Sequence, residues 1–135
     1  MDLVFLDANV LFSAAYRDSA GLTRLWEVSD AQLITSAYAY GEALRNLNRE
    51  QAQRLRQLVR DGVAVSTEPT GSLAIPDDVD LPAKDVPILR ASICAGATHL
   101  VTGDVTHFGP YFGRTIEGVL VLRPRTYLLS KGVVD

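Results

Sequence analysis

Short, mostly apolar runs alternate along this chain with stretches in which apolar residues recur every three or four positions. The short runs predict strands at 3–6, 33–35, 63–65, 99–101 and 119–122. The periodic stretches predict helices at 10–15, 21–28, 37–47, 51–60 and 86–95, with a last short turn at 127–129. Because strands alternate with helices, we predict an α/β fold with three layers. A central, mostly parallel sheet carries helices on both faces, in a single domain spanning 1–135.

The segment from 67 to 82 lacks either periodicity. It holds Pro69, Gly71, Pro76 and Pro82, which predict a loop. Ser36 is predicted to cap the helix that follows it, and Gly96 to end the helix before the fourth strand.

Four acidic residues are placed where their carboxylates would face one end of the sheet. Asp7 directly follows the first predicted strand, and Asp104 follows the fourth. Glu42 and Asp85 lie within or at the start of predicted helices. Ligands of open parallel sheets bind outside the carboxyl ends of the strands, so we expect these acids to converge there.

Clustered carboxylates repel one another and resist burial as anions. A hard divalent cation relieves this repulsion, and all-oxygen ligands suit Mg²⁺ or Mn²⁺. The four acids therefore predict a metal site, and metal-dependent phosphodiester hydrolysis is the leading functional hypothesis.

Each acid also has a structural explanation. Asp7 and Asp85 are suited to cap helices, Asp104 to hold a turn, and Glu42 to lie on a solvated helix face. Taken singly, these explanations are the commoner ones. Taken together, they leave open why two strand ends and two helices all supply acids.

The order and spacing of five segments resemble the PIN-domain family, most closely the toxin-component branch of toxin–antitoxin systems. The segments carry the motifs LDANVL at 6–11, GEALRNL at 41–47, KDVPIL at 84–89, LVTGD at 100–104 and GVLVLRP at 118–124. Together they span nearly the whole chain.

This resemblance implies a metal-dependent ribonuclease. Asp7, Glu42, Asp85 and Asp104 would line one acidic pocket, bind one or two Mg²⁺ or Mn²⁺ ions and leave a 5′-phosphate and a 3′-hydroxyl on the products. Such ions supply an activated water and neutralise charge on the scissile phosphate. Asn9 and Thr102 are candidates for orienting ligands or water, or for holding their own turns. We favour the second role for Thr102.

The chain departs from the family pattern after Asp104. Members often carry a further Asp just beyond this acid, whereas this chain has Val105, Thr106 and His107. The departure puts a fully occupied second metal site in doubt. His107 could contribute to that site, but we favour a role for His107 and Phe108 in packing or in capping the turn.

The net charge of −3 does not by itself indicate a nucleic-acid ligand, but five arginines gather between 45 and 60. Arg45 and Arg49 are therefore candidate RNA contacts, and a solvated helix face is an equally good explanation.

The resemblance also implies a homodimer and inhibition by an antitoxin. Apolar residues of the early helices would supply the surface for these partners, or the chain's own core: Leu11, Phe12, Tyr16, Leu22, Leu25, Trp26, Tyr38 and Tyr40.

No apolar run approaches the ~20 residues that a membrane helix needs. The first residues lack the basic region of a signal peptide and are predicted as a strand. The single Cys94 has no disulfide partner within the chain, so we expect a reducing cytoplasm and a buried thiol.

The main alternative is a PIN-like domain that binds RNA or protein through the acidic pocket without catalysis. A haloacid-dehalogenase-type phosphatase is weaker, because its second Asp would fall at Asn9. A nucleotide-binding redox domain lacks the glycine-rich loop after the first strand.

Overall fold

A six-stranded sheet, with the strand order β3-β2-β1-β4-β6-β5, forms the centre of the molecule. The computed structural model describes residues 1–67 and 73–133. The strands are β1 (Asp2–Leu6), β2 (Ala31–Ser36), β3 (Val63–Ser66), β4 (His99–Val101), β5 (Thr115–Ile116) and β6 (Val119–Leu122). All neighbouring pairs are parallel except β5 and β6. The predicted α/β class with a mostly parallel sheet is confirmed.

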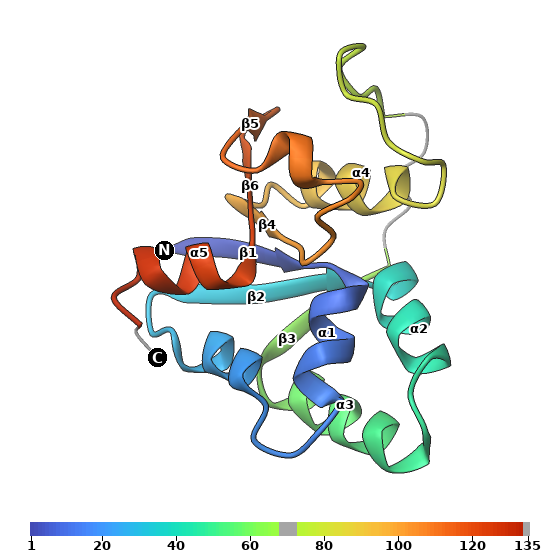
Figure 1. Cartoon of the computed structure of the whole chain (residues 1–135), viewed down its shortest axis with the longest axis vertical. Helices are drawn as coiled ribbons and strands as arrows, with labels where there is room; N and C mark the ends of the chain where they lie inside the picture. The colour runs from blue at the N-terminus through green and yellow to red at the C-terminus, as the bar shows by residue number, and fades with distance from the viewer. Residues whose placement is uncertain (68–72, 134–135) are drawn as a thin grey trace.

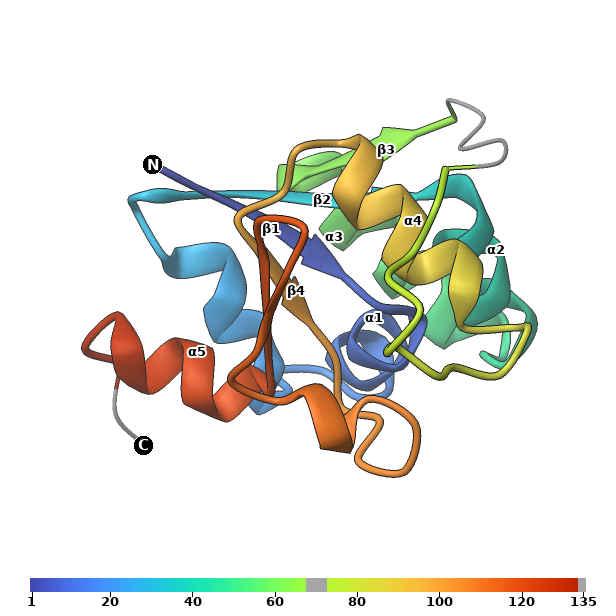
Figure 2. The ribbon, with the colours of Figure 1, turned by 90° about the horizontal axis from the view of Figure 1, so that it is seen from above.

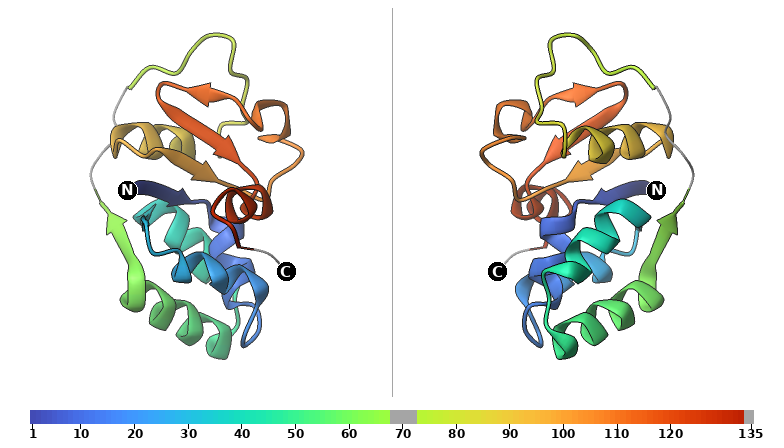
Figure 3. Two further views of the ribbon diagram at one scale, coloured as in Figure 1. Left: turned by 90° about the vertical axis from the view of Figure 1, so that its left-hand side faces the viewer. Right: turned by 90° about the vertical axis from the view of Figure 1, so that its right-hand side faces the viewer.

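Helices cover both faces of this sheet. They are α1 (Ala8–Ala15), α2 (Ala37–Arg45), α3 (Arg49–Gly62), α4 (Val86–Cys94) and α5 (Pro124–Ser130), with the 3₁₀ helices η1 (Gly21–Glu27) and η2 (Gly109–Tyr111). Figures 1 and 3 show α1, η1 and α3 on one side of β1 and β2, and α4 on the other. Across 1–67 and 73–133, no helix has the length and apolar character to cross a membrane.

The central strands are apolar throughout because both of their faces are covered. Val4, Phe5 and Leu6 of β1 are completely buried, as are Leu100 and Val101 of β4. These residues belong to one hydrophobic cluster that joins the two helical layers through the sheet. The core thus places the carboxyl ends of β1 and β4 beside each other.

Local capping explains where the helices start. The Ser36 hydroxyl accepts a hydrogen bond from the backbone N–H of Ala39 at 3.1 Å, as predicted, and begins α2. Asn48 and Gln51 form a reciprocal capping box at the start of α3, which separates α3 from α2. Pro124 occupies the first turn of α5, where its missing N–H is tolerated.

Two elements differ from the sequence predictions. The helix predicted at 21–28 is a 3₁₀ helix, whose period is close enough to the α-helical one to give a similar pattern. Strand β5 was not predicted, because two residues carry no readable alternation. Glu117 (φ 49°) and Gly118 (φ 86°) form the tight turn that pairs β5 with β6.

The expectation of a buried thiol is wrong, since Cys94 is exposed. It is the last residue of α4, past the positions that face the sheet. In the predicted loop, Pro69 and Gly71 lie outside the described residues. The part from 73 to 82 is free of helix and strand, as expected.

The strand order creates a crevice between β1 and β4. From β1 the chain steps through β2 to β3 on one side, and then returns to place β4 on the other side of β1. Leu6 pairs with Val101 at the carboxyl ends of these two strands. Figure 2 shows α1 starting at the end of β1, with α2 beside it. Open parallel sheets bind ligands at such a reversal of strand order.

Candidate metal centre

All four predicted acids line one pocket of about 440 Å³. Asp7 and Asp104 enter it from the carboxyl ends of β1 and β4, Glu42 from α2, and Asp85 from the start of α4. The remaining lining residues are Ala8, Asn9, Phe12, Ala43, Asn46 and Lys84. The carboxylates therefore come from four separate parts of the chain to one end of the sheet.

Asp7 is both a helix cap and a pocket acid. Its Oδ1 accepts a hydrogen bond from the Ala8 backbone N–H at 2.6 Å, and its Oδ2 accepts one from the Thr102 hydroxyl at 2.8 Å. Burial raises the pKa of Asp7 to about 6, although these hydrogen bonds oppose the shift, and the nearby Asp85 and Glu42 carboxylates raise it further. This is the behaviour expected of a carboxylate held among like charges.

Thr102 and Asn9 connect the two strand ends. The Thr102 hydroxyl also accepts a hydrogen bond from the Asp104 N–H at 3.1 Å, so it holds its own turn and orients Asp7. Asn9 donates through Nδ2 to Asp7 at 3.2 Å, and its Oδ1 accepts a bond from the Gly103 N–H at 2.8 Å.

Asp85 does not serve as a helix cap. It occupies the N-cap position of α4, but its carboxylate makes no capping hydrogen bond. Its Oδ2 is buried and, within 1–67 and 73–133, receives no hydrogen bond. Burial raises the pKa of Asp85, and the Asp104 carboxylate adds to this effect, while His107 opposes it. The capping explanation for Asp85 is therefore wrong.

Asp104 stabilises the turn after β4, as its structural explanation predicted. Its Oδ1 accepts a hydrogen bond from the His107 backbone N–H at 3.0 Å. The ring of His107 then folds back into the site, with Nδ1 at 2.9 Å from Asp104 Oδ2 and 3.0 Å from Asp85 Oδ2. His107 thus caps the turn, and it also contacts two pocket acids. The contact with Asp85 was not predicted, because it crosses between two loops.

Glu42 and Lys84 complete the rim of the pocket. Glu42 lies in α2, which packs against α1 and brings the carboxylate to the end of β1. Lys84 lines the pocket beside Asp85, and its backbone carbonyl accepts a hydrogen bond from the Tyr38 hydroxyl at 2.8 Å. Lys84 was not among the residues predicted for the site. Its position directly before Asp85 in the sequence could have indicated that it lines the pocket.

The donor set suits a divalent cation. The pocket offers four carboxylates, and one of them carries a buried oxygen without a hydrogen-bond donor among the described residues. Asp85, Asp104 and His107 present ligand atoms that all lie within 4.8 Å of one another. Carboxylate oxygens suit Mg²⁺ and Mn²⁺, and a cation would remove the cost of burying these anions together. The acidic cluster could therefore bind a metal ion.

The arginine stretch divides into different roles. Arg45 and Arg49, at the end of α2 and the start of α3, are exposed and lie outside the pocket lining. Arg54 instead donates to the carbonyl of Ala15 at 2.8 Å and pairs with Glu50 at 3.4 Å. Arg54 therefore fastens α3 to the end of α1.

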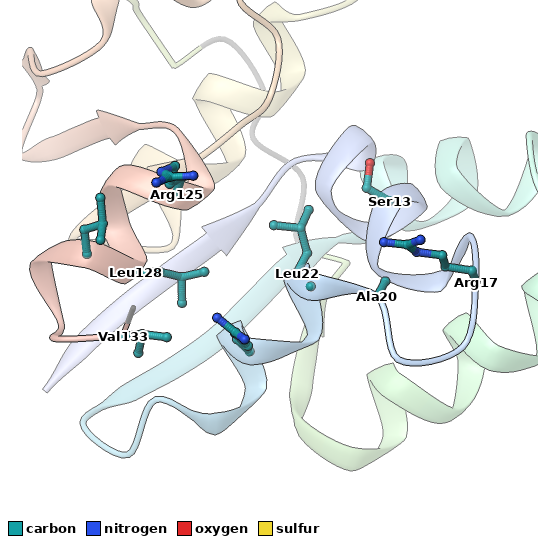
Figure 4. A pocket seen from close by; sticks show the side chains of 10 residues that line it. Ser13, Arg17, Ala20, Leu22, Arg125, Leu128 and Val133 are labelled. Atoms are coloured by element: carbon teal, nitrogen blue, oxygen red, sulfur yellow. The ribbon is translucent and has the colours of Figure 1, made fainter. Parts of the chain in front are cut away.

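A second pocket, of about 430 Å³, lies between the turn after α1, η1 and α5 (Figure 4). Arginine and leucine side chains dominate its lining: Arg17, Arg24, Arg125, Leu22, Leu128 and Leu129. No carboxylate lines it within the described part of the chain. It is consequently a site separate from the acidic pocket and of opposite charge.

The apolar residues of the early helices divide between core and surface. Leu11 and Leu25 are buried in the core, and Trp26 is half-buried with its Nε1 donating to the Leu58 carbonyl at 2.8 Å. Tyr16 is exposed and lies against Phe12, with 5.4 Å between the ring centroids. Tyr38 is also exposed. Only some of the eight residues predicted for a partner surface are therefore exposed.

Comparisons with known proteins agree with this architecture. No family model matches the chain, and no curated protein matches it in sequence. It is similar in structure to a chain in the crystal structure of VapBC2 from Rickettsia felis, which was solved bound to a DNA fragment from the VapBC2 promoter. The TM-score is 0.61 at 14% identity, covering 90% of this chain and 98% of that chain. The molecule has the PIN-like fold that its sequence motifs predicted.

Proposed function

We propose that this protein is a metal-dependent endoribonuclease, acting as the toxin of a toxin–antitoxin pair. The observation that carries the proposal is the meeting of Asp7, Glu42, Asp85 and Asp104 in one pocket, with a buried Asp85 oxygen that lacks a hydrogen-bond donor among the described residues. The PIN-like fold supports the same class of activity.

Four carboxylates would hold Mg²⁺ or Mn²⁺ at the end of the sheet. When bound, the cation supplies an activated water and neutralises charge on the scissile phosphate. Thr102 and Asn9 fix the orientation of Asp7 through their hydrogen bonds. Lys84 lies in the pocket lining, where its ammonium group attracts a phosphate. The expected products carry a 5′-phosphate and a 3′-hydroxyl.

RNA would approach over α2 and the start of α3. Arg45 follows Glu42 by three positions on α2, so the two side chains lie on the same side of that helix. Arg49 is exposed at the first position of α3. A positive rim beside an acidic floor holds a phosphate backbone even in a chain whose net charge is −3.

Protein partners form the second part of the proposal. The similar solved structure is of VapBC2 and a promoter DNA fragment, which supports an antitoxin partner for this chain. We place partner binding on the side of α1, η1 and α5, where Leu22 and Leu129 line the second pocket beside three arginines. Acidic and apolar side chains of a partner segment complement such a surface. A homodimer is expected as well.

One observation favours the alternative of a binding domain without catalysis. His107 contacts both Asp85 and Asp104, so these two acids have a partner in the fold even without a bound cation. In that case the pocket would bind RNA or protein without hydrolysing it.

A cleavage assay separates the two functions. Purified protein is incubated with structured and unstructured RNAs in Mg²⁺, Mn²⁺ or chelator. We expect cleavage with either cation and none with chelator. Asp7→Asn should abolish it, while Asp61→Asn, the same change on the exposed side of α3, should leave it intact. RNA binding without cleavage under every condition would instead support the binding domain.

A further inference from the structure

We propose that Asp85, Asp104 and His107 form a mixed carboxylate–imidazole subsite that takes a divalent transition-metal ion, such as Zn²⁺ or Co²⁺, in preference to Mg²⁺. The inference deepens the proposed function, on which it rests, by specifying the cation at one half of the acidic pocket. The other half, with Asp7 and Glu42, has no imidazole in its lining and offers side-chain oxygens.

The distances in this subsite match those between neighbouring ligands of one metal ion. His107 Nδ1 lies 2.9 Å from Asp104 Oδ2 and 3.0 Å from Asp85 Oδ2. Bonds of about 2.1 Å at right angles place adjacent ligands about 3.0 Å apart, and tetrahedral bonds of about 2.0 Å place them about 3.3 Å apart. The ligand atoms of the third pair, Asp85 and Asp104, lie within 4.8 Å of each other, so small movements would let all three residues share a cation.

Among these three ligand atoms, Oδ2 of Asp85 has no hydrogen-bond donor within the described residues. An imidazole nitrogen carries at most one hydrogen, so His107 Nδ1 can direct a well-aligned hydrogen bond at only one of the two carboxylates. The contact with Asp104 has hydrogen-bond geometry. Asp85 Oδ2 stays without a donor within the described ranges, although the residue is only 8% exposed. A cation at this point would bond to all three atoms at once.

The chemistry of the donors sets the preference. Imidazole nitrogen is a good ligand for Zn²⁺, Co²⁺ and their neighbours, whereas Mg²⁺ favours oxygen and keeps much of its water. The backbone N–H of His107 is held by Asp104 Oδ1 at 3.0 Å, so the main chain that carries the ring is already anchored beside the acid. The nitrogen donor is thus fixed in place before any ion arrives.

Nuclear magnetic resonance on the full chain tests the inference directly. Zn²⁺ is added to metal-free protein while long-range ¹H–¹⁵N spectra follow both imidazole rings. His99 is the internal control, because it lies at the opposite end of β4, where its Nδ1 contacts the Thr98 hydroxyl. We expect the Nδ1 resonance of His107 to shift on stoichiometric binding while His99 stays unchanged. Zn²⁺ binding that leaves the His107 ring unchanged would overturn the inference.

Calorimetry on variants measures the preference. His107→Asn should lower Zn²⁺ affinity by about 100-fold or more, since even partners of metal ligands are worth roughly 10–100-fold. Its effect on Mg²⁺ affinity should be much smaller. His107→Asp restores an oxygen donor and should shift the preference toward Mg²⁺, and His99→Gln should change neither affinity. Equal decreases for both cations in His107→Asn would contradict the assignment.

The outcomes distinguish this inference from the proposed function. Zn²⁺ bound through His107 without any RNA cleavage would defeat the ribonuclease and leave the subsite standing. Cleavage with Mg²⁺, together with no change at His107 on adding Zn²⁺, would support the ribonuclease and refute the subsite. The spectra use the unaltered chain, so the inference can be refuted even if a variant fails to fold.

Discussion

The hydroxyl of Thr102 donates a hydrogen bond to Oδ2 of Asp7 at 2.8 Å and so joins the carboxyl end of β4 to that of β1. The same hydroxyl oxygen accepts the backbone N–H of Asp104. One buried side chain therefore orients an acid on each of two strands, as outer-shell groups do around metal sites.

Replacing this hydroxyl should weaken metal binding more than folding. Thr102→Val keeps the shape of the side chain, but Asp7 loses its donor and becomes harder to ionise. We expect Mg²⁺ or Mn²⁺ affinity to fall by roughly 10–100-fold and the free energy of unfolding to fall by only about 1–3 kcal/mol. Titration calorimetry and urea denaturation measure the two effects. Thr102→Ser should retain most of the affinity, and equal affinity in Val and Ser variants would contradict this role.

The raised pKa of Asp7 predicts a pH dependence in metal-free protein. The folded pKa of about 6 lies above the unfolded value of 3.8, so the folded state holds a proton that the unfolded state has released. This group therefore reduces stability as pH rises from about 4 to about 6, by about 3 kcal/mol in total. Unfolding of wild type and Asp7→Asn should be compared across this range.

The difference between those two proteins isolates Asp7, because Asp85 and the other acids are present in both. The stability of Asp7→Asn relative to wild type should increase across the window and level off above it. Adding Mg²⁺ at pH 7.5 should raise the melting temperature of the wild type alone. A constant difference between the two proteins from pH 4 to pH 7 would show that Asp7 ionises normally.

Removing the Asp85 carboxylate should not destabilise α4. Its side chain makes no capping hydrogen bond, and burial raises its pKa, so Asp85→Asn should leave the metal-free unfolding free energy at pH 7 unchanged or higher. Ser36→Ala is the matched control, because Ser36 does cap α2, and its removal should cost about 1 kcal/mol. A comparable destabilisation in Asp85→Asn would restore the capping explanation.

The salt dependence of RNA binding tests the arginine rim. Replacing Arg45 and Arg49 with Gln should weaken binding and reduce the slope of log affinity against log salt by roughly 0.7 for each phosphate that is no longer neutralised. Arg56→Gln with Arg60→Gln is the control pair, since both are exposed later on α3. An unchanged slope for the first pair would mean that those arginines form only a solvated face.

Light scattering tests the partner surface. The chain has a mass of 14.7 kDa, and we expect about twice that value in solution. Leu129→Asp places a charge in the second pocket and should shift the equilibrium toward monomer. Leu73→Asp changes a leucine that is exposed elsewhere and should have no effect. A strict monomer at high concentration would rule out the homodimer.

The sequence predicted best what depends on neighbours along the chain. The apolar runs of β1 and β4 were readable because buried parallel strands are apolar on both faces. The same runs placed Asp7 and Asp104 at one edge, since parallel strands share their carboxyl ends. Strand β5 was unreadable because its two residues are too few to show an alternation of apolar and polar positions.

The parts of the site that were not predicted depend on the meeting of distant segments. His107 meets Asp85 only when the loop after β4 packs beside the start of α4. No periodicity encodes that approach. Lys84 is different, because it directly precedes Asp85, so its place beside a predicted pocket acid could have been read from the sequence. Leu11 and Leu25 are buried, whereas Tyr16 is exposed. This division depends on how the helices pack, so the sequence alone did not predict it.

The distance along the chain between Asp7 and Thr102, 95 positions, also bears on synthesis at the ribosome. The first strand and its acid emerge early, but the pocket cannot close until β4 leaves the exit tunnel and inserts beside β1. A nascent chain that has reached only β3 carries Asp7 and Glu42 and lacks Asp85 and Asp104. If the proposed ribonuclease activity holds, the chain would stay inert toward its own message for most of the time that message is being translated.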